Sequence, residues 1–218
     1  MPWLNRHLDH AGRERIESAL RAADRATSGE IVPVIARRSA RYGHAPWLAA
    51  ALCLAAAESA DWTGRLMPAW GHRTLAAAAL AILCAAIGGL LARIPGVRRV
   101  LTPRGDRILA VHRAAEAAFH HLALHRARGD AGVLLYVSLE ERRAVVLAGA
   151  GIADLAGPEH WEQTCRLLTL AAAKRDLGRG FEEAIAHAAQ VLAQHHPALA
   201  GGPAAVLAQR LRILHEPF

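Results

Sequence analysis

The sequence predicts an α/β fold in which a small central sheet is flanked by helices and interrupted by an inserted two-helix transmembrane hairpin. Residues 132–152 hold two apolar runs joined by a charged corner, a pattern typical of a β-hairpin. Residues 30–36, EIVPVIA, favour a further strand because they are rich in β-branched side chains. Two long uncharged runs, 47–57 and 74–91, lie between these strands and predict the inserted helices.

The predicted β-hairpin has strands at 133–139 and 144–148, and neither alternates polar with apolar residues. We therefore expect both faces of the sheet to be covered. The corner Glu140, Glu141, Arg142 and Arg143 is expected to face water. In the strand at 30–36, Pro33 lacks an N–H donor, so this strand is expected at an edge or beside a bulge.

Helical spacing of apolar residues predicts helices at 11–27, 107–125, 159–173 and 181–194, with a break at 176–180. The tail ends in a short amphipathic segment at 205–214. These elements divide the chain into 1–44, the first part of the α/β domain; 45–93, the membrane hairpin; 94–197, the second part of the domain; and 198–218, a C-terminal tail.

The membrane prediction depends on the lengths of the two uncharged runs. The run at 74–91 would be about 27 Å long as a helix, close to the thickness of a bilayer core. The run at 47–57 is shorter and is followed by Glu58 and Asp61. The alternative is a pair of alanine-rich helices buried in a core. Eight arginines flank the outer ends of the hairpin and two lie in its loop, so both termini are expected in the cytoplasm of a bacterium with the hairpin in the inner (plasma) membrane.

Composition narrows the class of protein further. The chain carries 26 Lys and Arg against 19 Asp and Glu, a formal charge of +7. This charge fits either an anionic membrane face or nucleic acid, and nucleic-acid binding is not expected because no recognition motif is present. The three cysteines are far apart in sequence, which indicates neither a zinc site nor a disulfide framework. The first residues lack the apolar core of a signal peptide, so none is expected.

One predicted helix presents histidines at regular spacing. His112, Glu116 and His120 follow one another at i, i+4 and i+8, and His121 and His125 form another i, i+4 pair. Imidazoles at this spacing can bind a metal. The alternative is a solvated histidine-rich face, which we favour because no HExxH pattern completes a metal site.

Several segments together resemble the bacterial integral-membrane branch of the TPM-domain proteins, an uncharacterised membrane protein family. They are SGEIVPVIARRSARYG, the helix at 107–119, and GVLLYVSLEERRAVVLAGAGI with the later Trp161. The resemblance implies an α/β sandwich with a small sheet, split in sequence by the membrane hairpin. The family-motif positions are Glu141, Arg142 and Trp161. Relatives are linked to photosystem repair, for which an acid phosphatase activity has been proposed, and to accessory subunits of a receptor channel.

The sequence departs from this family where the second hairpin strand ends. Relatives commonly carry an aspartate at the position of Gly149, so one carboxylate is missing here. Glu30, Asp130 and Asp154 are the acids expected to lie near the ends of the strands, and they form the candidate ligand or metal cleft. No cofactor is assigned from the sequence, and a divalent cation is the candidate for such a set.

Two function classes follow from these observations. The favoured one is an inner-membrane protein with a cytoplasmic TPM-like domain that is non-catalytic and binds a partner, or assists assembly and maintenance of membrane complexes. Its expected partners are the lipid bilayer and a membrane protein. The alternative is a metal-assisted phosphatase, which would need several convergent carboxylates around the cation.

Overall fold

The computed structural model describes residues 3–4, 7–39, 45–59, 73–91, 94, 96–97, 100, 102–198 and 211–214. The chain divides into two compact units, and each is described by itself. Unit 1 comprises Met1–Ala40 and Arg107–Phe218, and unit 2 comprises Arg41–Asp106.

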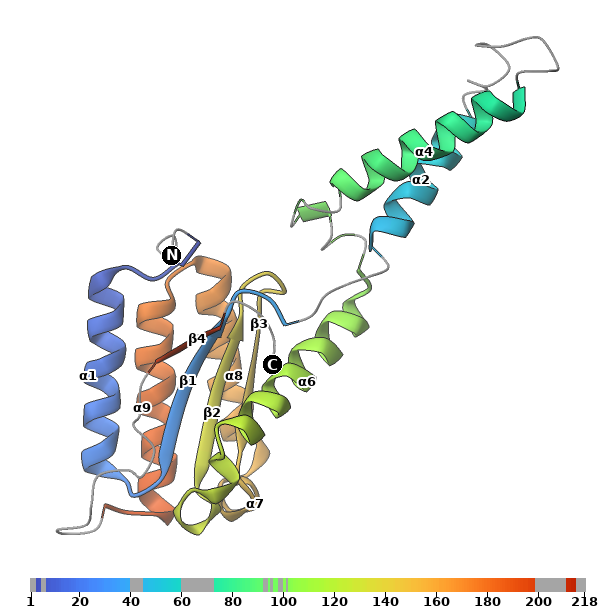
Figure 1. Cartoon of the computed structure of the whole chain (residues 1–218). Coiled ribbons are helices and arrows are strands. Elements are labelled where there is room, and N and C mark those ends of the chain that lie inside the picture. Colours follow the sequence, from blue (N-terminus) through green and yellow to red (C-terminus); the bar gives the residue numbers. More distant parts are fainter. Residues whose placement is uncertain are drawn as a thin grey trace. The chain divides into compact units, whose positions relative to one another are not determined.

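The sheet of unit 1 has four strands among the described residues, in the order β3-β2-β1-β4 (Figure 1). They are β1 (Glu30–Ala36), β2 (Gly132–Ser138), β3 (Arg143–Ala148) and β4 (Arg212–Leu214). β1 runs parallel to both β2 and β4, whereas β2 and β3 form the predicted antiparallel hairpin. The mixed sheet flanked by helices confirms the predicted α/β class.

Helices cover both faces of this sheet, as the unbroken apolar strands predict (Figure 1). Against one face lie α1 (His10–Ala26), α8 (Pro158–Lys174) and α9 (Leu177–His195). Against the other lie α6 (Arg104–His121) and the short 3-10 helix Leu124–Arg126, whose Leu124 is buried in the same cluster. Every residue of β1 and β2 is buried as a result.

Pro33 tests the expectation that β1 lies at an edge. β1 has a neighbour on each side, so the strand itself is interior. The Glu30 N–H points toward β2 and donates to the carbonyl of Ala131, just before that strand. The Arg37 N–H points toward β4 and donates to the carbonyl of Leu214. By alternation, position 33 faces β4, which pairs only from Val34 onward. The missing donor thus lies where no described strand would accept from it.

The start of α9 differs from the prediction, because a glycine that suggested a break lies inside the helix and allows close packing. The predicted break at 176–180 is shorter, since α9 begins at Leu177 after the N-cap Asp176. A Cβ on Gly178 would lie 2.5 Å from the Gly12 Cα, so this glycine lets α1 and α9 approach closely. The short helix α7 (Ala150–Ala156) was not predicted.

The remaining tail and corner also differ from expectation. Residues 212–214 of the predicted amphipathic segment form the strand β4, Leu211 precedes it, and 205–210 lie outside the described residues. At the hairpin corner Arg142 is exposed with a φ of 50°, but Glu141 is only 3 % exposed. The prediction that the whole corner faces water is therefore wrong for Glu141, because this carboxylate accepts hydrogen bonds inside the fold.

Unit 2 contains two packed helices, α2 (Ala45–Ser59) and α4 (Arg73–Leu91). They meet through small residues, because a Cβ on Gly88 would lie 2.7 Å from the Ala50 Cα. Gly89 faces open space. One of the two adjacent glycines therefore sets the close approach of the helices.

The membrane predictions do not hold. Among the helices that the structure describes, none combines the length and the apolar character needed to cross a bilayer. The predicted transmembrane hairpin is wrong, and so are the inner-membrane localisation and the function built on it. α2 gives the physical reason: its 15 residues measure about 22 Å as a helix, against a bilayer core of about 30 Å.

Candidate functional site

Two grooves follow the two edges of the sheet in unit 1. The first, which we call the β3 groove, has a volume of about 690 Å³ and combines the outer edge of β3 with both helix layers. It is lined by His112 of α6, by Val145, Val146, Leu147 and Ala148 of β3, by Ala153 and Asp154 of α7, and by Pro158, Trp161, Glu162 and Cys165 of α8. The lining is mainly apolar, as in most ligand-binding clefts.

The backbone of β3 points polar groups into this groove. The Gly149 N–H donates to the Gly132 carbonyl, 2.8 Å away, so this pair is hydrogen-bonded across β2 and β3. Hydrogen-bonded and non-hydrogen-bonded pairs alternate along an antiparallel ladder. The N–H and C=O groups of Ala144, Val146 and Ala148 therefore point away from β2, toward the open edge.

The thiol of Cys165 covers part of that edge. Its Sγ–H donates to the Ala144 carbonyl, 3.1 Å away, and the Val146 backbone also contacts the sulfur. Burial raises the pKa of this thiol, so the proton needed for donation stays on the sulfur at neutral pH. A residue of an added parallel strand would make contacts in the same two places. α8 thus protects the first half of the β3 edge.

The second half of the edge stays open. The Val146 carbonyl and the Ala148 N–H face the β3 groove and have no hydrogen-bond partner among the described residues. Trp161 and Pro158 flank them with apolar surface. At the rim, Glu162 pairs with Arg166 at 3.1 Å, whereas Asp154 has no ion-pair partner in the described part of the chain. The groove therefore offers open backbone donor and acceptor groups and one unpaired negative charge.

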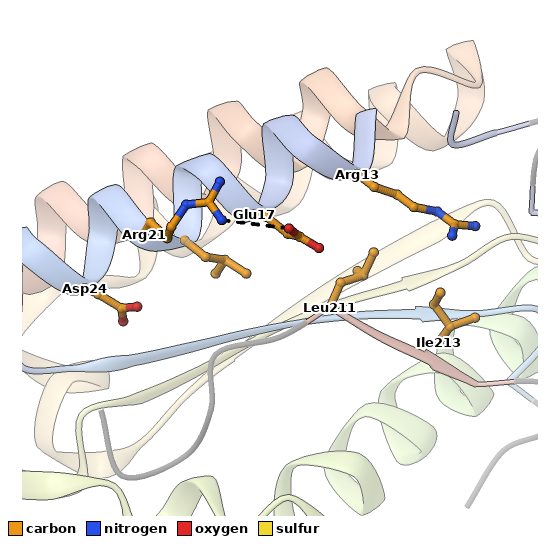
Figure 2. Close-up of a pocket in the computed structure, with 7 residues that line it drawn as sticks. Arg13, Glu17, Arg21, Asp24, Leu211 and Ile213 are labelled. Carbon is orange, nitrogen blue, oxygen red and sulfur yellow. Dashed lines mark ion pairs between the residues drawn. The ribbon is translucent and has the colours of Figure 1, made fainter. Parts of the chain in front are cut away.

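The second groove, the β4 groove, lies between α1 and the opposite edge of the sheet and has a volume of about 560 Å³. Figure 2 shows Arg13, Glu17, Arg21 and Asp24 projecting from α1 toward Leu211 and Ile213 beside β4. Glu17 and Arg21 form an exposed ion pair at 3.8 Å, drawn as a dashed line. Burial raises the pKa of Asp24.

The two grooves differ in what their strands offer. β4 covers part of the β1 edge with a parallel ladder, and this three-residue edge strand leaves only the backbone groups of Ile213 pointing away from β1. Its charges are balanced, with two arginines facing two acids. Among the described residues, the β3 groove offers the longer open strand edge together with an apolar lining, and it is the better candidate for a binding site.

The three acids predicted to form a cleft occupy different environments. Glu30 is buried at the start of β1, Asp130 is exposed in the turn before β2, and Asp154 is exposed on α7. The described residues contain no group of three or more His, Cys, Asp or Glu side chains that could hold a metal ion. Of the three, only Asp154 lines the β3 groove, and a role for the others stays a prediction.

Gly149 has a structural explanation. A Cβ at this position would collide with the Asp130 carbonyl, and one on Gly151 would collide with the Gly129 carbonyl. The turn from β3 into α7 packs so closely on the preceding loop that neither position accepts a side chain. The missing aspartate therefore coincides with a position where this fold has no room for one.

The family-motif positions are placed apart from one another. Trp161 lines the β3 groove, while Arg142 is exposed at the hairpin corner. Glu141 accepts hydrogen bonds from the Ser138 hydroxyl and from the Ser39 N–H at 3.3 Å. Ser39 is also hydrogen-bonded to Tyr136, whose pKa is raised to about 12, mainly by burial. This polar network joins the ends of β1 and β2 and was not predicted from the sequence.

A second unpredicted cluster joins α8 to α9. The buried Thr164 hydroxyl donates to the His160 carbonyl at 2.9 Å, so it accepts from His187 Nδ1 at 2.8 Å. The His160 and His187 rings stack with their centroids 6.0 Å apart. Burial lowers the pKa of His187, and the neighbouring His160 adds to the effect. On the predicted histidine face of α6, His112 pairs with Glu116 at 3.4 Å.

Comparisons with known proteins identify the fold and no activity. No family model and no curated protein matches the chain, so membership of the TPM-domain family stays a prediction. The NMR structure of the BA42 protein from the psychrophilic bacterium Bizionia argentinensis is similar, with a TM-score of 0.57 and 17% identity. The match covers 94% of this chain and 94% of that one. The two proteins thus share an overall fold, and neither a phosphatase nor another activity follows from it.

Proposed function

We propose that unit 1 is a peptide-binding module that adds an extended segment of a partner protein to the β3 edge. The observation that carries the proposal is the open pair of backbone groups on this edge, the Val146 carbonyl and the Ala148 N–H. An unpaired strand edge is a ready template for another strand. Strand addition gives affinity through backbone hydrogen bonds and specificity through side-chain pockets.

Two of the open groups fit an added strand that runs parallel to β3. One residue of a parallel strand, lying opposite Leu147, would donate to the Val146 carbonyl and accept from the Ala148 N–H. An antiparallel strand cannot pair at Val146, because the thiol of Cys165 already contacts its N–H side, but it could pair with both polar groups of Ala148. An added strand in either direction therefore needs the Ala148 N–H.

The lining of the groove determines which side chains the peptide carries. An apolar residue of the peptide would pack against Trp161 and Pro158. The unpaired carboxylate of Asp154 favours a lysine or arginine next to it. The partner segment is thus an extended run of alternating apolar and basic residues.

Proline at position 148 tests this proposal directly. The Ala148 N–H points away from β2, so Ala148→Pro removes the open donor and keeps the ladder within the hairpin. The probe is a fluorescein-labelled, end-blocked peptide of alternating valine and lysine, and the measurement is fluorescence anisotropy. We expect the proline variant to bind the peptide at least about tenfold more weakly, because it cannot donate the hydrogen bond from position 148.

Ala148→Val is the matched control, because valine keeps the N–H and suits a strand. It should bind within about twofold of the unmodified protein, a difference well below one hydrogen bond. Near-ultraviolet circular dichroism verifies that both variants are folded. Equal affinity of a folded proline variant and the unmodified protein would show that β3 does not accept a strand.

A further inference from the structure

Two histidines of unit 1, one on α8 and one on α9, lie next to each other. The rings of His160 and His187 are half-buried, and their centroids are 6.0 Å apart. Two imidazoles that bind one ion, each at about 2.0 Å from a ring nitrogen, have their centroids roughly 5–6 Å apart. The separation of these two rings therefore fits a shared metal ion.

The hydrogen bond of His187 determines which of its ring nitrogens is available to a ligand. Its Nδ1–H donates to the buried Thr164 hydroxyl oxygen at 2.8 Å, because that hydroxyl itself donates to the His160 carbonyl. The neutral ring thus keeps its lone pair on Nε2. A histidine whose other nitrogen is held in this way has the arrangement typical of a metal ligand.

The surroundings of His160 favour the same tautomer. The Glu159 carboxylate lies 3.4 Å from His160 Nδ1 and favours a proton on that nitrogen. The Nε2 atoms of His160 and His187 have no hydrogen-bond partner among the described residues. The His160 side chain is 43 % exposed, so a small rotation about χ2 can direct its lone pair toward that of His187.

A second pair of histidines lacks this support. The rings of His120 and His125, at the end of α6 and just beyond it, have centroids 5.5 Å apart, and both side chains are exposed. No hydrogen bond orients either ring in the described part of the chain. Rings that are free to move lose more freedom when they bind a ligand. This pair therefore serves as a control with the same chemistry and no orienting contact.

We propose that His160 and His187 together bind one divalent ion of the borderline transition metals, Zn²⁺, Cu²⁺ or Ni²⁺, through their Nε2 atoms. Imidazole suits these metals, whereas Mg²⁺ prefers oxygen ligands. Water completes the coordination, because the described residues offer no group of three or more ligating side chains. The ion joins α8 to α9, and its binding is independent of the peptide at β3.

The test is a titration of the untagged, nitrogen-15-labelled full-length chain with Cu²⁺ at neutral pH, followed by amide NMR. Paramagnetic Cu²⁺ broadens the signals of nearby residues, so the spectra locate the ion. His160→Phe keeps an aromatic ring and removes the ligand nitrogen, and His187→Gln removes the other ligand. Thr164→Val keeps both ligands and removes the oxygen that orients His187. His120→Gln with His125→Gln is the control, and far-ultraviolet circular dichroism verifies that each variant is folded.

We expect the amide signals of Thr164 and His187 to broaden first. Each of the two ligand variants should need more than about tenfold more Cu²⁺ for the same broadening, and Thr164→Val about tenfold more. The control should need no more than the unmodified chain. Excess Zn²⁺ should reverse the broadening and excess Mg²⁺ should not.

Three results would overturn the proposal. The first is earlier broadening around His120 and His125 than around Thr164 and His187. The second is an unchanged Cu²⁺ requirement in a folded His160→Phe or His187→Gln variant, because the two rings would then not share an ion. The third is an equal effect of Zn²⁺ and Mg²⁺ on the broadening.

Discussion

Ile35 in unit 1 is 0 % exposed, whereas Ile82 in unit 2 is 71 % exposed. Both lie in apolar runs of regular secondary structure, β1 and α4. In unit 1, helices cover the strand on both faces, so the isoleucine is enclosed. In unit 2, two helices can bury only the sides that face each other.

The comparison shows that an apolar run does not by itself define its surroundings. Enclosure within one chain takes at least two layers on a sheet or several helices around a core. A pair of helices with apolar residues on all sides lacks that enclosure. The same residue type is then enclosed in the core of unit 1 and exposed on the surface of unit 2.

The close packing of unit 1 is tested most severely by Gly149→Asp. The new Cβ would meet the backbone carbonyl of Asp130, which cannot rotate away as a side chain could. We expect a loss of more than about 4 kcal/mol in the free energy of unfolding, measured by urea denaturation. Ala150→Asp is the control, because that position is exposed in the first turn of α7 and an acid there is tolerated. Native stability of Gly149→Asp would contradict the packing at this turn.

The burial contrast itself is tested by the same substitution in each unit. Ile35→Ala should lower the free energy of unfolding by about 3 kcal/mol, because it leaves a cavity between the sheet and its helices. Ile82→Ala should change it by less than about 0.5 kcal/mol, since the side chain is mostly in water. Chemical denaturation followed by circular dichroism gives both values. A comparable cost at Ile82 would mean that this side of α4 is covered after all.

Substitutions at the two adjacent glycines of α4 distinguish the effect of helix packing from the effect of helix propensity on the stability of unit 2. Gly88→Ala should weaken the contact with Ala50 and lower the opening free energy of α4 by about 2 kcal/mol. Gly89→Ala meets open space and should raise it by up to about 1 kcal/mol, because alanine favours the helix. Amide hydrogen exchange along α4 measures both. Identical exchange in the two variants would refute the close approach at Gly88.

The smallest expected effect is a dependence of stability on pH in unit 1. The pKa of His187 is lowered in the folded protein, so the unfolded chain binds a proton more readily. Stability is therefore fully present well above the ordinary histidine pKa and decreases as the pH falls through about 6.5. His187→Gln should remove this component of the slope, by less than about 1 kcal/mol because the ring is only partly buried. Denaturation midpoints at pH 5.5 and 7.5 compare the two proteins, and identical slopes would refute the effect.

The sheet could be predicted from the sequence because its information is local. The apolar run that ends before Glu140 indicates a strand, and β2 and β3 lie within one residue of the predicted bounds. The role of Gly178 depends on Gly12, far away in the chain, so its sequence context suggested a break where the helix continues. Glu141 was expected at the surface for the same reason, because Ser39 reaches it only in the folded state.

The candidate site, too, could be predicted only in its local parts. Trp161 and Asp154 were named from the sequence, and both line the β3 groove. The groove itself was not predicted, because it depends on which backbone groups of β3 stay open once β2 has paired. The membrane hairpin was predicted from apolar character and run length, and the 15 residues of α2 are too few to cross a bilayer.

The parallel pairing of β1 with β2 has a consequence for how the chain folds. Glu30 meets Gly132, so all of unit 2 and α6 separate two neighbouring strands. The β2–β3 hairpin and the adjacent α8 and α9 are contiguous in sequence, so we expect them to form before β1 joins the sheet. Unit 2 shortens this search, because Gly88 lies against Ala50 and returns the chain close to its point of departure. Amides of β2 and β3 should thus become protected from exchange before those of β1 during refolding.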